Sequence, residues 1–401
     1  MPLWNTSTDP GEPVALFACT EHWRSHAQVG THHIARCFAA RGWKVGFVSA
    51  PINVLHLAGR GNDAAARSAS WRAGGAVDPD SGVWHYVPFA PLPWASVPLL
   101  RAEAVVRAAW ALCRPQLASV LRRAGFDRVD MRCTDHFMHE GLLTASSAHL
   151  TVFRRADNLA AQPGAGVDFA QREIGFAQRA DLTLCTTASG ARYLQEQGAR
   201  ETMVMPNAIR LDRFFSDAPI PVEYAEQTRP IVVYVGAADH RLDVDLVARA
   251  VAETQDCHWV LIGPLRARSA ERLRRAGADV LGPRPHDRLP AYLQHARVGV
   301  VPFSVTKYGP LLSETSPLKV LEYAASGLPV VGTSGCQYPA GLPTPVAVCN
   351  SADAFIAAVR SCALRPKPPR PRVEAFAAHA WQSRLAPLFG WLADRGLASP
   401  C

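Results

Sequence analysis

The sequence predicts an α/β protein built on two doubly wound parallel sheets. Short apolar runs, typical of buried strands, alternate along the chain with longer segments of helical periodicity. The chain has 401 residues, more than one hydrophobic core usually organises. The alternation also restarts at residues 230–236, after a polar and Pro-rich stretch at residues 216–229. We therefore expect one domain over residues 1–207 and a second over residues 208–372, joined near residues 216–229.

The first half opens with a strand, a helix and a second strand. Residues 14–19 and 43–48 are apolar runs, and the helix expected near residues 31–41 ends at a glycine. The polar loop between the first strand and this helix collects basic side chains: His22, Arg24, His26, His32 and His33. Loops that follow parallel strands line the ligand-binding edge of a sheet, so we expect His22, Arg24 and His32 to contact a substrate. Surface or structural histidines are the alternative, and the spacing is a weak metal signature.

Residues 94–123 mix apolar and basic side chains. Several arginines lie among Trp94, Val106, Trp110 and other apolar residues, and only Glu103 opposes their charge. A basic amphipathic segment can lie on an anionic lipid surface with its apolar side immersed. A core helix with a solvated basic face has the same pattern, so both interpretations stay open.

A carboxylate follows the next clear strand. Residues 150–155 form a strand-like run, and Asp157 lies just beyond it. At the carboxyl end of a parallel strand this side chain faces the ligand-binding edge, where a catalytic base is placed. An Asp that only caps its own loop is the alternative. A helix at residues 169–179, a strand at 181–187 and a helix at 188–197 complete this half.

The second half repeats the alternation. Strands are expected at residues 230–236, 259–263, 278–282 and 297–303, and helices at 244–254, 267–276 and 287–297. Gly236 ends the first of these strands, where backbone N–H groups can approach a diphosphate. Arg284 follows the third strand and is a candidate to flank a nucleobase.

The stretch after the last of these strands is the most informative part of the chain. Ser316 is expected to cap a helix of about ten residues, with Pro317 at its first position and Gly327 at its end. Ser316, Lys319 and Glu322 recur every third residue and so share one helix face. The helix start and Lys319 can bind an anion, and Glu322 can accept hydrogen bonds from hydroxyls. A phosphate joined to a polyol fits this row, which indicates a nucleotide sugar; a capped surface helix with solvated side chains is the alternative.

The carboxyl-terminal tail is expected to return to the first domain. Residues 365–372 are rich in Pro and basic residues and predict a stiff linker. A segment with helically spaced apolar side chains follows over residues 373–401, and we expect it to pack against the first domain.

Composition narrows the class of protein. Apolar residues make up 48% and charged residues 19% of the chain, as in globular proteins. The formal charge of +8 fits nucleic acid, an anionic membrane or an acidic substrate, but no interleaved aromatic and basic residues indicate nucleic-acid binding. The ten scattered cysteines indicate free thiols in a reducing compartment. Residues 1–13 hold no secretory signal, and no apolar run reaches the length of about 18 residues that a membrane-spanning helix needs. We therefore expect a cytoplasmic protein, and peripheral binding to the inner face of the plasma membrane is compatible with this location.

The combination of these motifs resembles the GT-B glycosyltransferases. Seven residues separate Glu314 from Glu322, Pro206-Asn207 lies near the joint, and Gly236 follows the first strand of the second half. The resemblance implies two Rossmann-like domains that face each other over a cleft, the first binding an acceptor and the second a nucleotide sugar. It also implies transfer without a metal ion or another cofactor.

A closer likeness is to the membrane-associated glucuronosyltransferases of xanthan assembly, the GumK type. It rests on residues 31–42, 153–157 and 316–323. This likeness implies that Asp157 is the general base and that Lys319 binds UDP. It further implies that a sugar such as glucuronate passes to a saccharide or lipid-linked acceptor in polysaccharide biosynthesis.

One departure from the GumK type leaves the donor and the stereochemistry open. That type has Gln at the position of Glu322. The alternatives are a retaining transferase that uses Glu314 and Glu322 with a donor such as GDP-mannose, a sugar-nucleotide epimerase, and a carbohydrate-binding protein of the same fold. His22, Arg24 and His32 in the basic loop of the first domain are the candidates to contact the acceptor.

Overall fold

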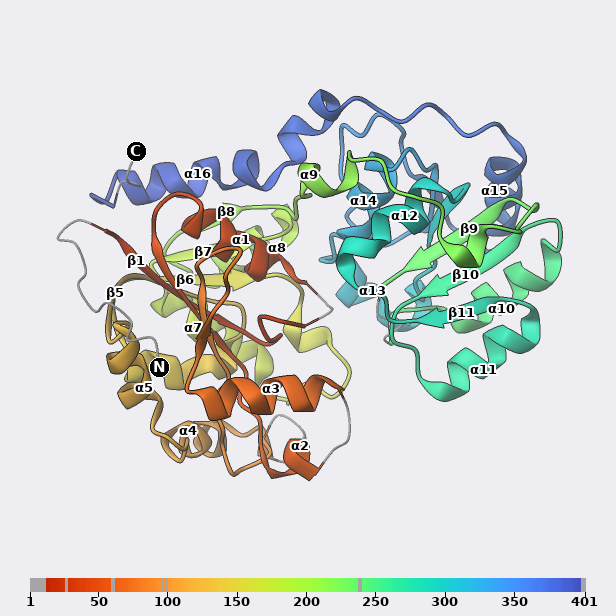
Figure 1. Cartoon of the computed structure of the whole chain (residues 1–401). Helices are drawn as coiled ribbons and strands as arrows, with labels where there is room; N and C mark the ends of the chain where they lie inside the picture. The colour runs from red at the N-terminus through yellow and green to blue at the C-terminus, as the bar shows by residue number, and fades with distance from the viewer. Residues whose placement is uncertain are drawn as a thin grey trace. The chain divides into compact units, whose positions relative to one another are not determined.

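The computed structural model describes residues 12–25, 28–58, 62–94, 97, 100–236 and 240–397. The chain divides into two compact units (Figure 1). The first ends at Met205, close to the predicted boundary at residue 207, and takes up the chain again from Leu385. The second comprises Pro206–Arg384. The second unit therefore includes residues 216–229, which we expected at the joint. It also includes residues 373–384, which we expected on the first domain.

The first unit is built on an eight-stranded sheet that is parallel except for one antiparallel pair at its edge. In sheet order the strands are β3 (Ala76–Val77), β4 (Trp84–Tyr86), β2 (Lys44–Ser49), β1 (Val14–Cys19), β5 (Arg128–Thr134), β6 (Ser147–Arg155), β7 (Leu182–Cys185) and β8 (Thr202–Val204). The chain builds outward from β1 through β2 to the edge strand β3, inserts β4 between β3 and β2, and then returns beside β1 with β5 and continues to β8. The order reverses between β1 and β5, and open α/β sheets bind ligands at such a switch point.

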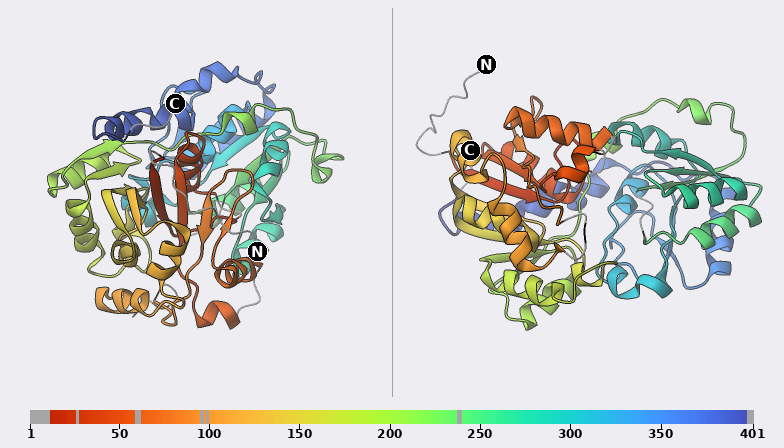
Figure 2. Two further views of the ribbon diagram at one scale, coloured as in Figure 1. Left: turned by 60° about the vertical axis from the view of Figure 1, so that its left-hand side comes forward. Right: turned by 90° about the horizontal axis from the view of Figure 1, so that it is seen from below.

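Helices pack against both faces of this sheet (Figures 1 and 2). The α-helices are α1 (Gly30–Ala39), α2 (Val54–Ala58), α3 (Asn62–Ala73), α4 (Glu103–Ala111), α5 (Leu117–Ala124), α6 (Glu140–Ala145), α7 (Phe169–Arg179) and α8 (Ala188–Glu196). Short 3-10 turns, η2 (Phe137–His139) and η3 (Leu159–Ala161), follow β5 and β6. Strands β1 and β2 at the centre of the sheet and β7 are almost wholly buried, which explains why they are mostly apolar in sequence.

Within the basic segment at residues 94–123, helices α4 and α5 pack on the core of the first unit, and the structure gives no support to an apolar side immersed in lipid. Val106 and Trp110 of α4 and Leu121 of α5 are buried in the core, whereas Arg107 and Arg122 are exposed. The apolar side already packs against the protein. The alternative, core helices with a solvated basic face, is the one that the structure contains.

The second unit is built on a six-stranded parallel sheet. In sheet order its strands are β11 (Asp279–Gly282), β10 (His258–Ile262), β9 (Ile231–Val235), β12 (Val298–Val301), β13 (Val330–Thr333) and β14 (Ala347–Cys349). The helices are α9 (Leu211–Phe214), α10 (Val244–Glu253), α11 (Ala267–Ala276), α12 (Leu289–Gln294), α13 (Val305–Leu312), α14 (Lys319–Ala325) and α15 (Ala352–Leu364), with the 3-10 turns η4 (Val222–Tyr224), η5 (His286–Arg288) and η6 (Val373–His379). The strand order reverses between β9 and β12, which is the switch point of this sheet.

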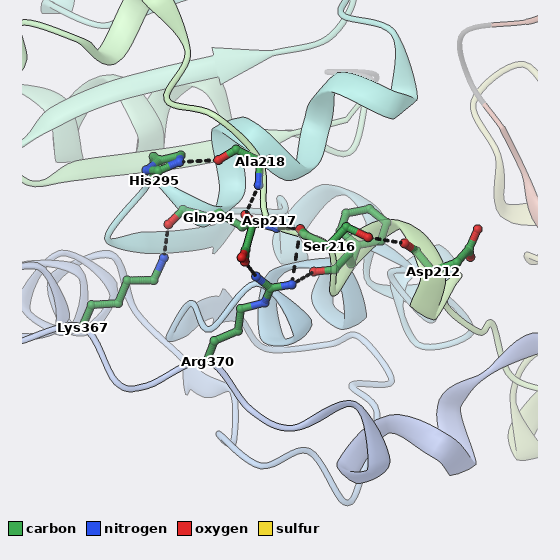
Figure 3. Close-up of polar contacts among 9 residues, drawn as sticks. Asp212, Ser216, Asp217, Ala218, Gln294, His295, Lys367 and Arg370 are labelled. Carbon is green, nitrogen blue, oxygen red and sulfur yellow. Dashed lines mark hydrogen bonds and ion pairs between the residues drawn. The ribbon is translucent and has the colours of Figure 1, made fainter.

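The Pro-rich stretch at residues 365–372 lies on the second unit and is not a detached linker (Figure 3). Lys367 Nζ donates to the carbonyl oxygen of Gln294 at 2.5 Å, and Arg370 Nη1 donates to Asp217 Oδ1 at 2.9 Å. Burial, then the nearby guanidinium groups, lowers the pKa of Lys367 to about 8. Charged side chains thus fasten this stretch to α12 and to the loop after α9.

The last helix, α16 (Trp381–Ala393), returns to the first unit from residue 385 onward. The Phe389 ring lies 4.6 Å from that of Phe38, and the guanidinium of Arg41 lies 3.9 Å over the same Phe389 ring. Trp391 Nε1 donates to Glu201 Oε2 at 2.6 Å. The helix that the sequence predicts from residue 373 therefore begins at residue 381, and residues 398–401 lie outside the described part of the chain.

Within the ranges that the structure describes, no helix is both long and apolar enough to span a bilayer. The cysteines in those ranges are free thiols. No group of three or more His, Cys, Asp and Glu side chains in the same ranges is placed to hold a metal ion.

Candidate functional site

Lys319 marks the switch point of the second sheet. It is the first residue of α14, and its Nζ lies 4.0 Å from the ring centroid of Tyr234 on β9 and 5.1 Å from that of Phe303 just after β12. The aromatic faces attract the ammonium group and hold it at the carboxyl end of these two strands. A fixed positive charge at this point is suited to an anionic ligand.

Gly236 has no side chain, and the Lys319 ammonium group occupies the space that a side chain would fill. A Cβ atom built on Gly236 would lie 2.5 Å from Lys319 Nζ, and the backbone at Gly236 has a φ of +141°. Both the contact and the conformation disfavour any residue with a side chain. Gly236 and Lys319 thus lie together at the end of β9, and their binding of a diphosphate stays a prediction. Residues 237–239 of the following loop lie outside the described residues.

Helix α14 is fixed against the sheet by Tyr323. Its hydroxyl accepts a 2.7 Å hydrogen bond from the backbone N–H of Val235, and the ring is fully buried. A Cβ atom on Gly299 of β12 would lie 2.4 Å from this ring, so Gly299 is required for the close approach. The anchor lies one turn after Lys319 and fixes the start of α14, with that lysine, against β9.

The start of α14 differs from the prediction. The helix spans seven residues from Lys319, and the residue before it makes no side-chain cap. The prediction that Ser316 caps the helix, with Pro317 at the first helical position, is therefore wrong. The N–H groups of Val320 and Leu321 instead turn back to the carbonyl oxygens of Pro317 and Leu318 at 3.2 and 3.0 Å. The Ser316 carbonyl oxygen accepts a 2.9 Å hydrogen bond from Asn207 Nδ2, so Asn207 positions the approach to the helix.

Glu322 lies one turn along the same helix face and is held by a histidine. Its side chain is 8% exposed, and Oε1 lies 3.0 Å from Nε2 of His286 in η5. The ring of Phe214 packs edge-on against His286 with 5.9 Å between the ring centroids. Sequence reasoning missed His286, because the contact joins two segments 36 residues apart.

Arg284 is occupied by a network of its own. Its Nη2 donates to Glu223 Oε1 at 2.9 Å, its Nε to the Tyr292 hydroxyl at 3.1 Å, and its Nη1 to the Leu281 carbonyl oxygen at 2.7 Å. These hydrogen bonds, Glu223 first, raise the pKa of Arg284. The structure therefore gives Arg284 a role in tying η4 to α12, and its contact with a nucleobase stays a prediction.

Arg241 is a cation that sequence reasoning missed. Its guanidinium carbon lies 5.8 Å from the Phe303 ring centroid, the same ring that faces Lys319. The Arg241 carbonyl oxygen accepts a 2.8 Å hydrogen bond from the N–H of Ser304, which fixes this backbone at the end of β12. A basic residue shortly after the strand-ending glycine is the signal that could have found it.

Glu314 lies in the turn between α13 and α14. Its N–H turns back to the Leu311 carbonyl oxygen at 3.3 Å, and the neighbouring Thr315 hydroxyl donates to the same carbonyl at 3.0 Å. Glu314 is thus not on the helix that carries Lys319 and Glu322.

Asp157 lies just beyond β6, at the carboxyl end of the first sheet. Two contacts fix its neighbours: Thr186 Oγ1 donates to the Ala156 carbonyl oxygen at 2.6 Å, and Asn158 Oδ1 accepts from the N–H of Ala161 at 3.1 Å. The residue before this loop, Arg155, forms a fully buried 3.0 Å ion pair with Glu173 of α7. A buried pair of this kind holds the strand end in one position.

A second carboxylate, Asp135, follows the neighbouring strand β5 at the switch point of the first sheet. Its Oδ1 accepts from the N–H of Thr20 at 3.1 Å, and its Oδ2 accepts from the Thr31 hydroxyl at 3.0 Å. Both oxygens therefore tie the loop after β1 and helix α1 to β5. Sequence reasoning missed Asp135, although its position after a strand matches that of Asp157.

The basic loop after β1 separates into buried and exposed residues. His32 is fully buried. Its Nδ1 accepts a hydrogen bond from the N–H of Val29 at 3.3 Å. Because one ring nitrogen of a neutral imidazole accepts and the other donates, Nε2 donates to the His22 carbonyl oxygen at 3.0 Å. Burial lowers the pKa of His32 to about 4. The ring is thus a structural element, and the prediction that His32 contacts a substrate is wrong. His22 and Arg24 line a cavity, and His26 lies outside the described residues.

Family comparisons agree with this division of the chain. A model of the family described as "Glycosyl transferases group 1" matches residues 229–364, within the second unit. A model of the family described as "Glucuronosyltransferase GumK, N-terminal domain" matches residues 17–131, within the first unit.

Individual relatives are more distant. A putative teichuronic acid biosynthesis glycosyltransferase, TuaH of Bacillus subtilis (strain 168), is 25% identical over 171 residues, which cover 40% of this chain and 42% of TuaH. Among solved structures, sucrose-phosphate synthase from Thermosynechococcus elongatus matches with a TM-score of 0.67 and 18% identity, over 97% of this chain and 100% of that one. Anabaena HepE, solved in complex with UDP and glucose, matches with a TM-score of 0.65 and 12% identity, over 96% and 100% of the two chains.

The structural matches establish the fold, and the family matches assign each half of the chain. The chain thus has the GT-B fold, and its two units are similar to the N-terminal domain of the glucuronosyltransferase GumK and to the group 1 glycosyl transferases.

Proposed function

We propose that this glycosyltransferase moves a sugar from a UDP-sugar to a saccharide or lipid-linked acceptor in polysaccharide biosynthesis. The observation that carries the donor half is the position of Lys319 at the switch point of β9 and β12, beside Gly236, whose φ of +141° disfavours residues with a side chain. HepE, a protein of the same fold, has been solved with UDP and glucose. The GumK-type match of the first unit supports glucuronate as a candidate sugar and an acceptor site in that unit.

The donor diphosphate would lie between Lys319 and Arg241. Both cations lie near the Phe303 ring, with Lys319 Nζ and the Arg241 guanidinium carbon 5.1 and 5.8 Å from its centroid. Positive groups fixed at the ends of strands can neutralise the charge that develops on a leaving diphosphate, which is the task of a metal ion in other enzymes. Ser316, held through its carbonyl by Asn207, would border the same phosphates.

Glu322 would bind the ribose of the donor. It lies three residues after Lys319, about 4.5 Å farther along the helix axis, and the ribose joined to the phosphate would extend toward it. Its buried carboxylate can accept hydrogen bonds from vicinal hydroxyls, and a charged acceptor makes such bonds stronger than neutral ones.

Asp157 would act as the general base. The acceptor hydroxyl gives its proton to Asp157 while its oxygen attacks the anomeric carbon, and the bond from that carbon to the diphosphate oxygen breaks with its electron pair leaving on UDP. A single displacement inverts the anomeric configuration. General-base assistance of this kind contributes about 10²- to 10⁴-fold in rate.

A donor screen followed by product analysis tests the proposal. We expect UDP and UDP-sugars to raise the melting temperature more than GDP and GDP-sugars, and the product glycoside to have the inverted anomeric configuration by NMR. Retention would favour the alternative that uses Glu314 and Glu322 with another donor. Conversion of the UDP-sugar into a different sugar nucleotide in the absence of acceptor would make the protein an epimerase and contradict the proposal.

A further inference from the structure

Arg370, in the Pro-rich stretch at residues 365–372, caps helix α9. Its Nη2 donates to the Phe214 carbonyl oxygen at 3.0 Å, and its Nη1 donates to Asp217 Oδ1 at 2.9 Å in the segment after the helix (Figure 3). Phe214 is the last residue of α9, and the last carbonyl groups of a helix have no partner within it. The Asp217 side chain is fully exposed, so this ion pair contributes little to stability. The bond to the Phe214 carbonyl is therefore the contact that holds the end of α9.

The backbone of Arg370 meets the end of a second helix, α14. Gly327 follows that helix with a φ of +74°, and a Cβ atom built on it would lie 3.2 Å from the Cα atom of Arg370. Two carbon atoms normally keep a larger separation, so the absence of a side chain at position 327 lets the stretch lie directly on the helix end. Arg370 thus contacts both α9 and the end of the helix that carries Lys319 and Glu322.

The same two helices also meet through a histidine. The buried Phe214 ring packs edge-on against His286 with 5.9 Å between the ring centroids, and His286 Nε2 lies 3.0 Å from Glu322 Oε1. The contacts therefore close a ring that runs from α14 through η5 and α9 to Arg370 and back to the end of α14. In a closed ring of packed groups, one member can shift only together with its neighbours.

The direction of the Glu322 carboxylate depends on this ring of contacts. His286 orients the carboxylate, and Phe214 sets the position of the His286 imidazole. If the end of α9 moved away, the imidazole could turn and the carboxylate could turn with it. Hydrogen bonds weaken steeply as they bend, so a carboxylate already fixed toward a ligand binds hydroxyl groups more tightly than a mobile one.

We propose that Arg370 is a positioning residue for ribose binding, which holds the Glu322 carboxylate in its binding direction through α9 and His286. The inference rests on the proposed function, because it takes Glu322 as the ribose ligand. In this role Arg370 acts through other residues and does not touch the nucleotide. The Pro-rich stretch, which the sequence presents as a linker, is then a working part of the nucleotide-sugar unit.

The discrimination between UDP and 2′-deoxy-UDP measures this role. Arg370→Met keeps the apolar stem of the side chain and removes its hydrogen-bond donors. Calorimetric titration of the full chain with each nucleotide should show that the ratio of the two affinities falls about threefold in this variant, as expected when one orienting hydrogen bond is lost. Arg370→Lys keeps a charged donor and should recover most of the ratio.

Lys367→Met is the matched control. Lys367 fastens the same stretch to α12, where it donates to the Gln294 carbonyl oxygen at 2.5 Å. Both substitutions loosen the stretch, so a general loss of stability would change the two variants alike. Lys367→Met leaves the cap of α9 in place and is therefore expected to keep the affinity ratio of the unaltered chain.

The position of His286 can also be followed without any nucleotide. In the chain with isotope-labelled histidine, the NMR signal of the His286 Cε1–H group is assigned with His286→Gln. It should shift in Arg370→Met and stay in place in Lys367→Met.

The two measurements separate this inference from the proposed function. A His286 signal that Arg370→Met leaves unchanged, or a ribose preference that survives in this variant, would overturn the inference and leave the proposed function standing. Equal binding of the two nucleotides by the unaltered chain would instead contradict the proposed role of Glu322. The NMR comparison would still decide whether Arg370 positions the pair of His286 and Glu322.

Discussion

His286 Nε2 and Glu322 Oε1 lie 3.0 Å apart, and this contact joins the turn after β11 to the helix that carries Lys319. Glu322 is 8% exposed on its side chain, so its carboxylate is almost wholly shielded from water before any ligand binds. A buried carboxylate needs hydrogen-bond donors, and His286 supplies one. The pair fixes the direction of the carboxylate and leaves Oε2 as the oxygen that a ribose would meet.

Replacing His286 by Phe is expected to weaken UDP binding by about tenfold, because Glu322 loses a donor that orients it. His286→Gln, which keeps a donor, should stay within about threefold of the unaltered chain. Calorimetric titration with UDP and with 2′-deoxy-UDP measures both effects, and the preference for the ribose form should shrink only in the Phe variant. An unchanged preference in that variant would show that His286 does not position Glu322 for ribose.

Gly236→Ala is expected to weaken UDP binding by at least about tenfold, because the added Cβ would lie 2.5 Å from Lys319 Nζ and displace the ammonium group. The positive φ adds a cost of about 1 to 3 kcal/mol in folding free energy. Gly341→Ala is the matched control, since Gly341 has a φ of +73° with no atom within 4 Å of the built Cβ. Equal UDP affinities of the two variants would remove Gly236 from the site.

Asp157→Asn is expected to lower kcat by about 10²- to 10⁴-fold, because the amide cannot accept the acceptor proton. UDP affinity should stay unchanged, since Asp157 belongs to the first unit. Single-turnover kinetics with a saturating donor separates the chemical step from donor binding. Turnover that persists at the original rate would assign the base to another group.

His32 makes folding stability depend on pH. Its pKa in the folded chain is about 4, lowered mainly by burial from the ordinary value of 6.5. As pH falls from 6.5 towards 4, the unfolded chain takes up a proton that the folded chain does not, so stability falls across this window by up to about 3 kcal/mol. Denaturant unfolding of the unaltered chain and of His32→Gln should show a smaller loss in the variant. His149→Gln, at an exposed position, should keep the original slope; identical slopes for both variants would contradict this assignment.

Local patterns were sufficient to predict the fold. The central strands β1, β9 and β12 are continuous apolar runs because they are buried on both faces of their sheets, and Gly236 and Lys319 carried recognisable signals. The amphipathic segment at residues 94–123 could not be resolved in the same way. An apolar helix face has the same sequence pattern whether a protein core or a lipid surface covers it, and here Val106 and Trp110 are covered by the core.

The residues that sequence reasoning missed depend on contacts between distant segments. His286 meets Glu322, Arg241 meets the ring that also faces Lys319, and Arg370 meets both α9 and the glycine that follows α14. The burial of His32 was equally hidden, because a histidine in a polar loop looks the same whether its ring nitrogens face solvent or the backbone.

Calorimetric titration of UDP into the unaltered chain and into Lys319→Ala is the most direct test of the donor site. We expect the Ala variant to bind UDP about 10- to 100-fold more weakly, because a charged hydrogen-bond donor to the diphosphate is lost. Lys307→Ala, which removes an exposed lysine of α13, should bind within about twofold of the unaltered chain. If Lys319→Ala binds UDP as tightly as the unaltered chain does, the diphosphate does not lie at the switch point of the second sheet.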